Sequence, residues 1–302
     1  TDEDGLWIVG GGDPKLLSQD LERLADELRD KGLKHIDGPI HLDLSVFDQQ
    51  NLPPAYEQKS TTSGYRAAIG ALGVDYGAIT LSVRPDKRTV RPKVQIISAR
   101  GYEALDNRAS QDGGKENKLT YALSVMDDGR MRVTIGGNIG KGHPPLTQRL
   151  RMLDPNLGTA HLLRAALKKR GIEAGSTIEV SSQRPPSLPL LIEHRGEPLA
   201  VLLKGVNTYS NNFMAETIFK HLGQTWERSQ KRVGDTLQSL GLKAGSFNIV
   251  NGSGLYRATT ITPASMLGLL VTMAKHPKLG RPFIETLAMS GHPGTLQRRL
   301  RR

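Results

Sequence analysis

The chain has 302 residues, with 41 Lys and Arg against 30 Asp and Glu, which gives a net charge of +11. It contains no cysteine, so disulfides, thiolate zinc sites and thiol nucleophiles are excluded. No apolar run reaches the roughly 18 residues that a membrane-spanning helix needs, and we expect no integral membrane segment.

The basic balance is compatible with an anionic wall polymer, a membrane surface or nucleic acid. Aromatic residues make up only 5% of the chain, and no arginine–aromatic alternation resembles a platform for base stacking. We therefore expect no nucleic-acid partner.

The first half of the sequence is predicted to be rich in strands, with one clear helix. A strand over 7–9 is followed by a helix whose start is predicted at Asp13 and Pro14, since Asp caps helices and Pro suits the first position. Its apolar stripe consists of Leu17, Leu21, Leu24 and Leu28. Alternating apolar residues predict a further strand over 35–44.

Several short elements are expected next in the chain. Residues 48–66 are polar and rich in Pro, Ser and Thr, which predicts a loop, and 67–83 predict two short strands around the turn at 75–77. Another strand is expected over 94–97, and the polar residues 106–118 predict a mobile loop.

The strongest hairpin signal lies at 121–135. Two strand-like runs, 121–126 and 131–135, are joined through Asp128 and Gly129, and Asp-Gly supplies the positive φ that a tight turn needs.

The second half is predicted to be mainly helical. Apolar periodicity and helix stop signals predict helices over 159–170, 199–206, 212–222, 226–240 and 262–274, with strands over 177–181 and 247–250. On the helix over 212–222, Met214, Ile218 and Leu222 are expected to share the apolar face.

Motifs for nucleotide or metal binding are not convincing. The run 136–142 lacks two residues of a phosphate-binding loop, and the histidines are scattered without metal-ligand spacing. We expect neither a metal site nor a nucleotide-binding loop.

The turn Ser210-Asn211-Asn212 stands directly before an apolar helix. One interpretation is simple capping, in which a Ser or Asn side chain accepts a hydrogen bond from the first turn of the helix. The other is functional: the Ser210 hydroxyl relays a proton and the Asn212 amide holds a substrate carbonyl.

Three segments in a fixed order carry a resemblance to a known family: YSNNFMAE, then NGSGLYRATTITPASML, then SGHPGTLQRRL. Together with the N-terminal segment GGGDPKLLSQDLERLADELRDKGLKHIDGPIHLDLSVFD, they resemble the penicillin-binding proteins of the D-alanyl-D-alanine carboxypeptidase/endopeptidase type, the penicillin-binding protein 4 (DacB) family. The resemblance runs over nearly the whole chain.

The resemblance implies a serine enzyme with three motifs at one cleft, Ser-x-x-Lys, Ser-x-Asn and Lys-Thr-Gly. Only the middle motif is present, and it carries over to Ser210, as a proton-relay partner, and to Asn212, as a hydrogen-bond donor to the peptide. The other two motifs are absent, as in a chain truncated at both ends, so we expect the chain by itself to be inactive and poorly stable. Asn251 departs from the Asp that is usual in the family, at a position that we expect to be structural.

The resemblance further implies an α+β fold, with a penicillin-binding (serine β-lactamase/transpeptidase-like) α/β core that carries inserted β-rich domains. Residues 1–152 would form the inserted β-rich region, with a nested domain at about 36–104, and 153–302 would form the C-terminal part of the core. The implied partners are peptidoglycan peptides, with β-lactams as acylating inhibitors, in the periplasm or extracytoplasmic cell envelope. The alternative is a non-catalytic wall-binding relative that lacks the nucleophile.

Overall fold

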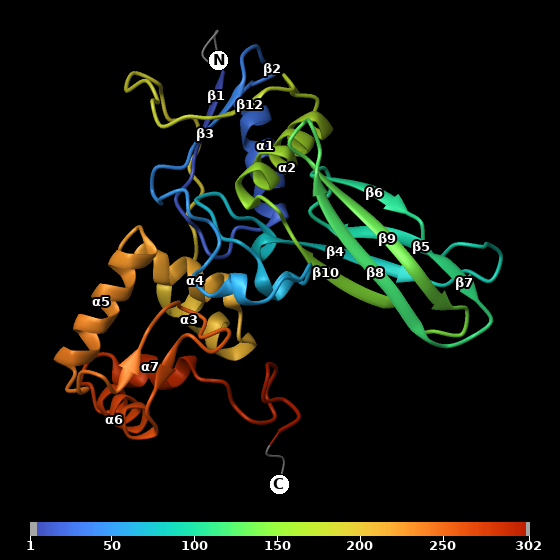
Figure 1. The fold of residues 1–302 in the computed structure, drawn as a ribbon. Coiled ribbons are helices and arrows are strands. Elements are labelled where there is room, and N and C mark those ends of the chain that lie inside the picture. The colour runs from blue at the N-terminus through green and yellow to red at the C-terminus, as the bar shows by residue number, and fades with distance from the viewer. Residues whose placement is uncertain (1–4, 300–302) are drawn as a thin grey trace. The chain divides into compact units, whose positions relative to one another are not determined.

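The computed structural model describes residues 5–299 as a mixture of helices and strands (Figure 1). The chain divides into two compact units, which we call unit 1 and unit 2. Unit 1 comprises the described residues up to 11, with 16–45 and 61–194, and unit 2 comprises 12–15, 46–60 and the described residues from 195 on. The predicted division at 152/153 and the nested domain stay predictions.

Unit 1 contains a small parallel sheet and two helices. The sheet has the order β1 (Leu6–Val9), β3 (Ile40–Asp43) and β12 (Ile178–Val180). Beside it lie α1 (Ser18–Asp30) and α2 (Pro155–Lys169), and a second parallel pair is formed by β2 (His35–Ile36) and β11 (Glu173–Ala174).

Unit 1 also contains two further sheets (Figure 1). One is antiparallel, with the order β10 (Leu146–Arg151), β4 (Ala78–Arg84) and β5 (Lys93–Ser98). The other centres on β9 (Met131–Gly140), which pairs with β6 (Glu103–Asn107), β7 (Ser110–Asp112) and β8 (Asn117–Val125). The predicted hairpin is confirmed as β8 and β9, with Gly129 at φ +76° in its turn.

The predicted start of the first helix at Asp13 is wrong. Asp13 Oδ1 accepts the Lys15 N–H in a local turn, and α1 begins only at Ser18. The Ser18 N–H donates to Asp75 Oδ1 at 2.9 Å, so a distant carboxylate satisfies the first turn of the helix.

The predicted strand before residue 75 is also wrong, since residues 67–74 are buried but lie outside any strand. At Leu72 both backbone groups are satisfied by side chains of α2 instead of by a neighbouring strand. The Leu72 N–H donates to Asn156 Oδ1 at 3.0 Å, and the Thr159 hydroxyl donates to the Leu72 carbonyl. The predicted loop over 106–118 differs too, because it contains β7 and the start of β8.

Unit 2 is mainly helical. Its helices are α3 (Leu199–Tyr209), α4 (Asn212–His221), α5 (Trp226–Ser239), α6 (Pro263–Ala274) and α7 (Gly280–Thr286). The strands β13 (Phe247–Asn248) and β14 (Thr260–Ile261) form an antiparallel pair between α5 and α6. No described helix of the chain combines the length and the apolar character that crossing a bilayer demands.

Candidate active site

Ser210 and Asn212 lie at the corner where α3 ends and α4 begins. Ser210 is exposed and has the left-handed backbone conformation, with φ 53° and ψ 50°. A non-glycine residue there costs about 1 kcal/mol, and such strain is concentrated at functional sites. Ser210 is the C-cap of α3, a position where helices commonly end in this conformation, and its side chain is exposed.

The capping interpretation applies to the middle residue of the motif. Asn211 is the N-cap of α4, and its Oδ1 accepts the Met214 N–H at 3.1 Å. Ser210 makes no side-chain cap to the helix, and Asn212 is the first, half-buried residue of α4. The N-cap of α4 is therefore Asn211, which lies between the two residues predicted to act on substrate.

A second predicted segment returns to this corner. The Thr295 N–H donates to the Thr208 carbonyl at 3.0 Å, two residues before Ser210. Gly294 lies so close that a Cβ there would stand 2.6 Å from the same carbonyl oxygen. The fold thus brings the SGHPGT segment beside the Ser-x-Asn turn.

The third predicted segment, around Asn251, is attached to α4 through Glu216. This carboxylate is fully buried and accepts the N–H groups of Gly252 and Ser253, each at 2.9 Å. Only glycine fits at 252, since a Cβ there would lie 2.5 Å from the Phe219 Cβ. Burial raises the pKa of Glu216, and the hydrogen bonds from Ser253 and Gly252 oppose that shift.

Asn251 is buried and holds the turn together from inside. Its Oδ1 accepts the Gly254 N–H at 2.9 Å, and its Nδ2 donates to the Pro54 carbonyl at 2.9 Å. An ionised Asp would lack that donor, so the amide suits this packing. These contacts are those of a structural residue.

Lys220 lies one turn beyond Glu216 on α4 and is also fully buried. Its Nζ lies 2.5 Å from Asp48 Oδ1 and donates to the Gln50 carbonyl at 2.8 Å. The ammonium also lies over the rings of Phe47 and Trp226, 5.4 Å and 5.0 Å from their centroids. Burial lowers its pKa, whereas Asp48 opposes the shift.

Sequence analysis missed Glu216 and Lys220. The predicted apolar face of α4 was partly wrong, because Leu222 is exposed whereas Glu216, Thr217 and Lys220 are buried. One signal was available: Asn212, Glu216 and Lys220 are spaced four residues apart and therefore share one face of the helix.

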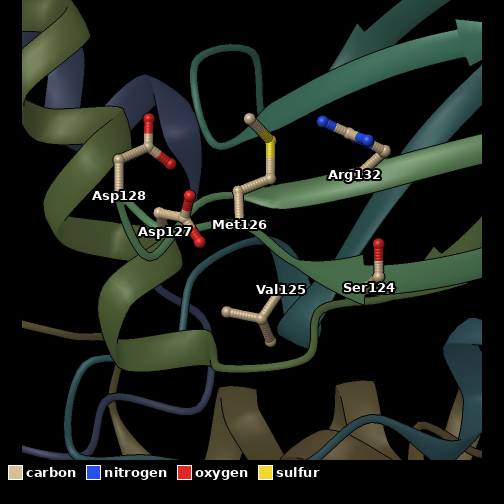
Figure 2. Close-up of a pocket in the computed structure, with 6 residues that line it drawn as sticks. All are labelled: Ser124, Val125, Met126, Asp127, Asp128 and Arg132. Atoms are coloured by element: carbon tan, nitrogen blue, oxygen red, sulfur yellow. The ribbon is translucent and has the colours of Figure 1, made fainter.

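A surface hollow in unit 1 contains none of the predicted site residues. It lies at the β8–β9 turn and is lined by Ser124, Val125, Met126, Asp127, Asp128 and Arg132 (Figure 2). Asp128 pairs with Arg130 at 2.6 Å, and that hydrogen bond lowers the carboxyl pKa. Among residues 5–299, no group of three His, Asp or Glu side chains is placed to hold a metal ion.

The chain is similar to known proteins over nearly its whole length. A model of the D-Ala-D-Ala carboxypeptidase 3 (S13) family matches residues 1–302. The chain is 27% identical over 316 residues to a D-alanyl-D-alanine carboxypeptidase of Actinomadura sp. (strain R39), covering 98% of this chain and 58% of that protein. It is 25% identical over 306 residues to the D-alanyl-D-alanine carboxypeptidase DacB of Haemophilus influenzae, covering 98% of this chain and 63% of that protein.

Solved structures show the same fold. Penicillin binding protein 4 (DacB) from Haemophilus influenzae superposes with a TM-score of 0.80 at 23% identity, covering 97% of this chain and 66% of that one. A second structure of that protein, complexed with a β-lactam, gives a TM-score of 0.72 at 24% identity, covering 97% of this chain and 64% of that one. The α+β, penicillin-binding fold class is thereby confirmed.

The chain spans about three-fifths of the length of the curated relatives it matches. The family match extends over all three segments that carry the sequence resemblance, and over the inserted region before them. By this match, the chain belongs to the D-Ala-D-Ala carboxypeptidase 3 (S13) family, as its sequence predicted.

Proposed function

We propose that the chain is part of a serine-type D-alanyl-D-alanine carboxypeptidase/endopeptidase that cleaves peptidoglycan stem peptides through an acyl-enzyme. The observation that carries this proposal is the α3–α4 corner, where the Ser210 side chain is exposed and Asn211, not Ser210, is the N-cap of α4. The family match over 1–302 supports assigning this corner to acyl transfer.

In this reaction Ser210 relays a proton and Asn212 binds the peptide. A hydroxyl can accept and donate a proton at one oxygen, which suits a relay between a nucleophile, its base and the leaving amine. The Asn212 amide donates a hydrogen bond to the stem peptide and orients its scissile bond for attack.

The nucleophile and its activating lysine are not supplied by motifs of this chain, since no Ser-x-x-Lys occurs in it. Without a nucleophile there is no acyl-enzyme route. We expect the 302-residue chain alone to give neither peptide turnover nor a penicillin adduct.

Labelled penicillin tests the proposal on the full-length gene product. We expect a stable adduct, seen as a mass shift, with acylation slowed about 10²–10⁴-fold in Ser210→Ala and about 10–100-fold in Asn212→Ala. Ser239→Ala, an exposed serine at the end of α5, is the matched control and should acylate normally. No adduct on the full-length product would favour a non-catalytic wall-binding relative instead.

We further propose an extracytoplasmic location in the cell envelope, where peptidoglycan peptides are the substrates and β-lactams the inhibitors. The net charge of +11 is favourable near anionic envelope polymers. The reaction as proposed uses no cofactor, so acylation should be unchanged after dialysis against a chelator.

A further inference from the structure

The loop between β4 and β5 in unit 1 concentrates positive charge. Together with the last residue of β4 and the first residue of β5, it carries one carboxylate, Asp86, and five exposed cations: Arg84, Lys87, Arg88, Arg91 and Lys93. Within residues 5–299, none of these five cations makes an ion pair with a carboxylate. We call residues 84–93 the basic loop.

Two amide side chains from the neighbouring sheet hold the basic loop in one conformation. Gln111 Oε1 accepts the Asp86 N–H at 2.7 Å, and its Nε2 donates to the carbonyls of Asp86 and Thr89, each at 3.0 Å. Asn107 Nδ2 donates to the Pro92 carbonyl at 2.9 Å. The Arg91 guanidinium folds back and donates to the Asn107 carbonyl at 2.6 Å. The backbone that carries the cations is therefore fixed, so binding would cost little ordering of the chain.

An apolar residue stands among these cations. Val90 is 79% exposed and lies between Arg88 and Arg91, while its carbonyl accepts the Gln111 N–H at 3.2 Å. The backbone contact fixes the residue, and its side chain stays in solvent. Folding of unit 1 does not use this apolar side chain.

Neighbouring residues add charge of the same sign. Lys115 and Lys141 lie by the end of β7, since the Lys141 N–H donates to the Asp112 carbonyl at 2.8 Å. The carboxylate of Asp112 is engaged locally, because its Oδ1 accepts the Gly114 N–H at 2.7 Å. Lys115 and Lys141 thus add positive charge near the basic loop, alongside the carboxylates of Asp112 and Glu116.

We propose that the basic loop docks unit 1 onto an anionic lipid bilayer, with Val90 entering the interface and the cations contacting lipid phosphates. Each cation close to an anionic bilayer is worth about a fivefold gain in affinity, and an inserted apolar side chain adds to it. A soluble phosphate polymer would use the cations but would gain nothing from Val90, and this favours the bilayer. The proposal is independent of the acyl-transfer reaction, because it uses no residue of the α3–α4 corner.

Vesicle co-sedimentation of the chain tests this inference. We expect binding to vesicles that contain phosphatidylglycerol, little binding to pure phosphatidylcholine vesicles, and weakening as salt rises. The variant Lys87→Gln, Arg88→Gln, Lys93→Gln should bind about a hundredfold more weakly, since it loses three cations and leaves the Gln111 and Asn107 contacts in place.

The control removes the same charge elsewhere: Lys59→Gln, Lys243→Gln, Lys275→Gln, all exposed residues of unit 2. It should bind nearly as well as the parent chain. Equal losses in the two triple variants would overturn the proposal, because net charge alone would then explain binding.

Val90 separates a bilayer from a soluble polyanion. Val90→Ser should weaken vesicle binding several-fold, and Val90→Trp should show a blue-shifted emission on phosphatidylglycerol vesicles relative to the parent chain. If Val90→Ser binds vesicles as the parent does, and inorganic polyphosphate competes fully, the partner is a soluble phosphate polymer and the bilayer proposal is wrong.

Discussion

Unit 1 and unit 2 differ in the side chains that they bury completely. In unit 1 the fully buried residues are largely aliphatic, among them Ile79, Leu81, Ile135 and Leu167. In unit 2 helix α4 buries Glu216 and Lys220, and the apolar helix α6 buries no residue.

The difference indicates that different interactions hold the two units in a fixed structure. Apolar burial is non-directional and tolerates small shifts, whereas a buried carboxylate demands donors at fixed positions. Glu216 and Lys220 thus fix the helix that begins at Asn212 against the turn at 251–255 and the segment 48–50. We expect unit 2 to be sensitive to polar substitutions and unit 1 to cavities.

The largest expected effect is that of Glu216→Ala. The change removes two charge-assisted hydrogen bonds and leaves the N–H groups of Gly252 and Ser253 without their acceptor. The free energy of unfolding of unit 2 should therefore fall by about 4 kcal/mol. Denaturant unfolding measures this loss of stability, and hydrogen exchange of the 251–255 peptide locates it. Glu227→Ala, an exposed carboxylate in the first turn of α5, should cost about 0.5 kcal/mol or less. Similar losses in the two variants would contradict the role given to Glu216.

Leu167→Ala tests the other side of the comparison. Leu167 is fully buried in the core of unit 1, and its truncation should cost about 3 kcal/mol through lost burial and a cavity. Hydrogen exchange should become faster in peptides of α1 and α2. Val125→Ala, at an exposed position of β8, is the control and should change stability by less than about 1 kcal/mol. A loss no greater than that of the control would show that this core is loosely packed.

We expect unit 1 to be sensitive to pH through His161. Burial, together with the nearby Arg164, lowers its pKa from 6.5 to about 4, although Asp128 opposes the shift. A group with a lowered basic pKa is neutral in the folded state, so its stabilisation is present above pH 6.5 and is lost as the pH falls toward 4. The loss should approach about 3 kcal/mol, given about 1.4 kcal/mol per pKa unit.

Thermal or denaturant unfolding between pH 7.5 and 4 measures this loss, and His161→Phe should flatten the slope in that range. An unchanged slope in the variant would assign the pH dependence to other groups.

The smallest expected effects come from the buried ion pair of unit 2, and they should be unequal. The side chain of Lys220 is 1% exposed whereas that of Asp48 is 32% exposed. Asp48→Asn leaves a buried cation without its carboxylate and should cost about 2 kcal/mol. Lys220→Met leaves a carboxylate that reaches water and should cost about 1 kcal/mol. Denaturant unfolding of the two variants decides the order, and the reverse order would mean that the ammonium is better solvated than its burial indicates.

Local patterns predicted most of the elements. The hairpin of β8 and β9 followed from Asp128-Gly129 between two strand-like runs, and the start of α6 followed from Thr262 and Pro263, since Thr262 does accept the Ser265 N–H. Ordered motifs predicted the family and, within it, Ser210 and Asn212 as site residues, whose roles stay proposals. Errors occurred where a partner far away in the chain decided the outcome, as at Ser18 with Asp75.

What the sequence by itself determined is therefore the fold class, the family and the position of the Ser-x-Asn turn, since these depend on residue types at short spacing. Only the tertiary structure decided that Asn211 is the cap, that Glu216 and Lys220 are buried, and that Gln111 and Asn107 hold the basic loop. The physical reason is that burying a polar side chain depends on a matching group, and that group can come from 172 residues away, as Asp48 does for Lys220.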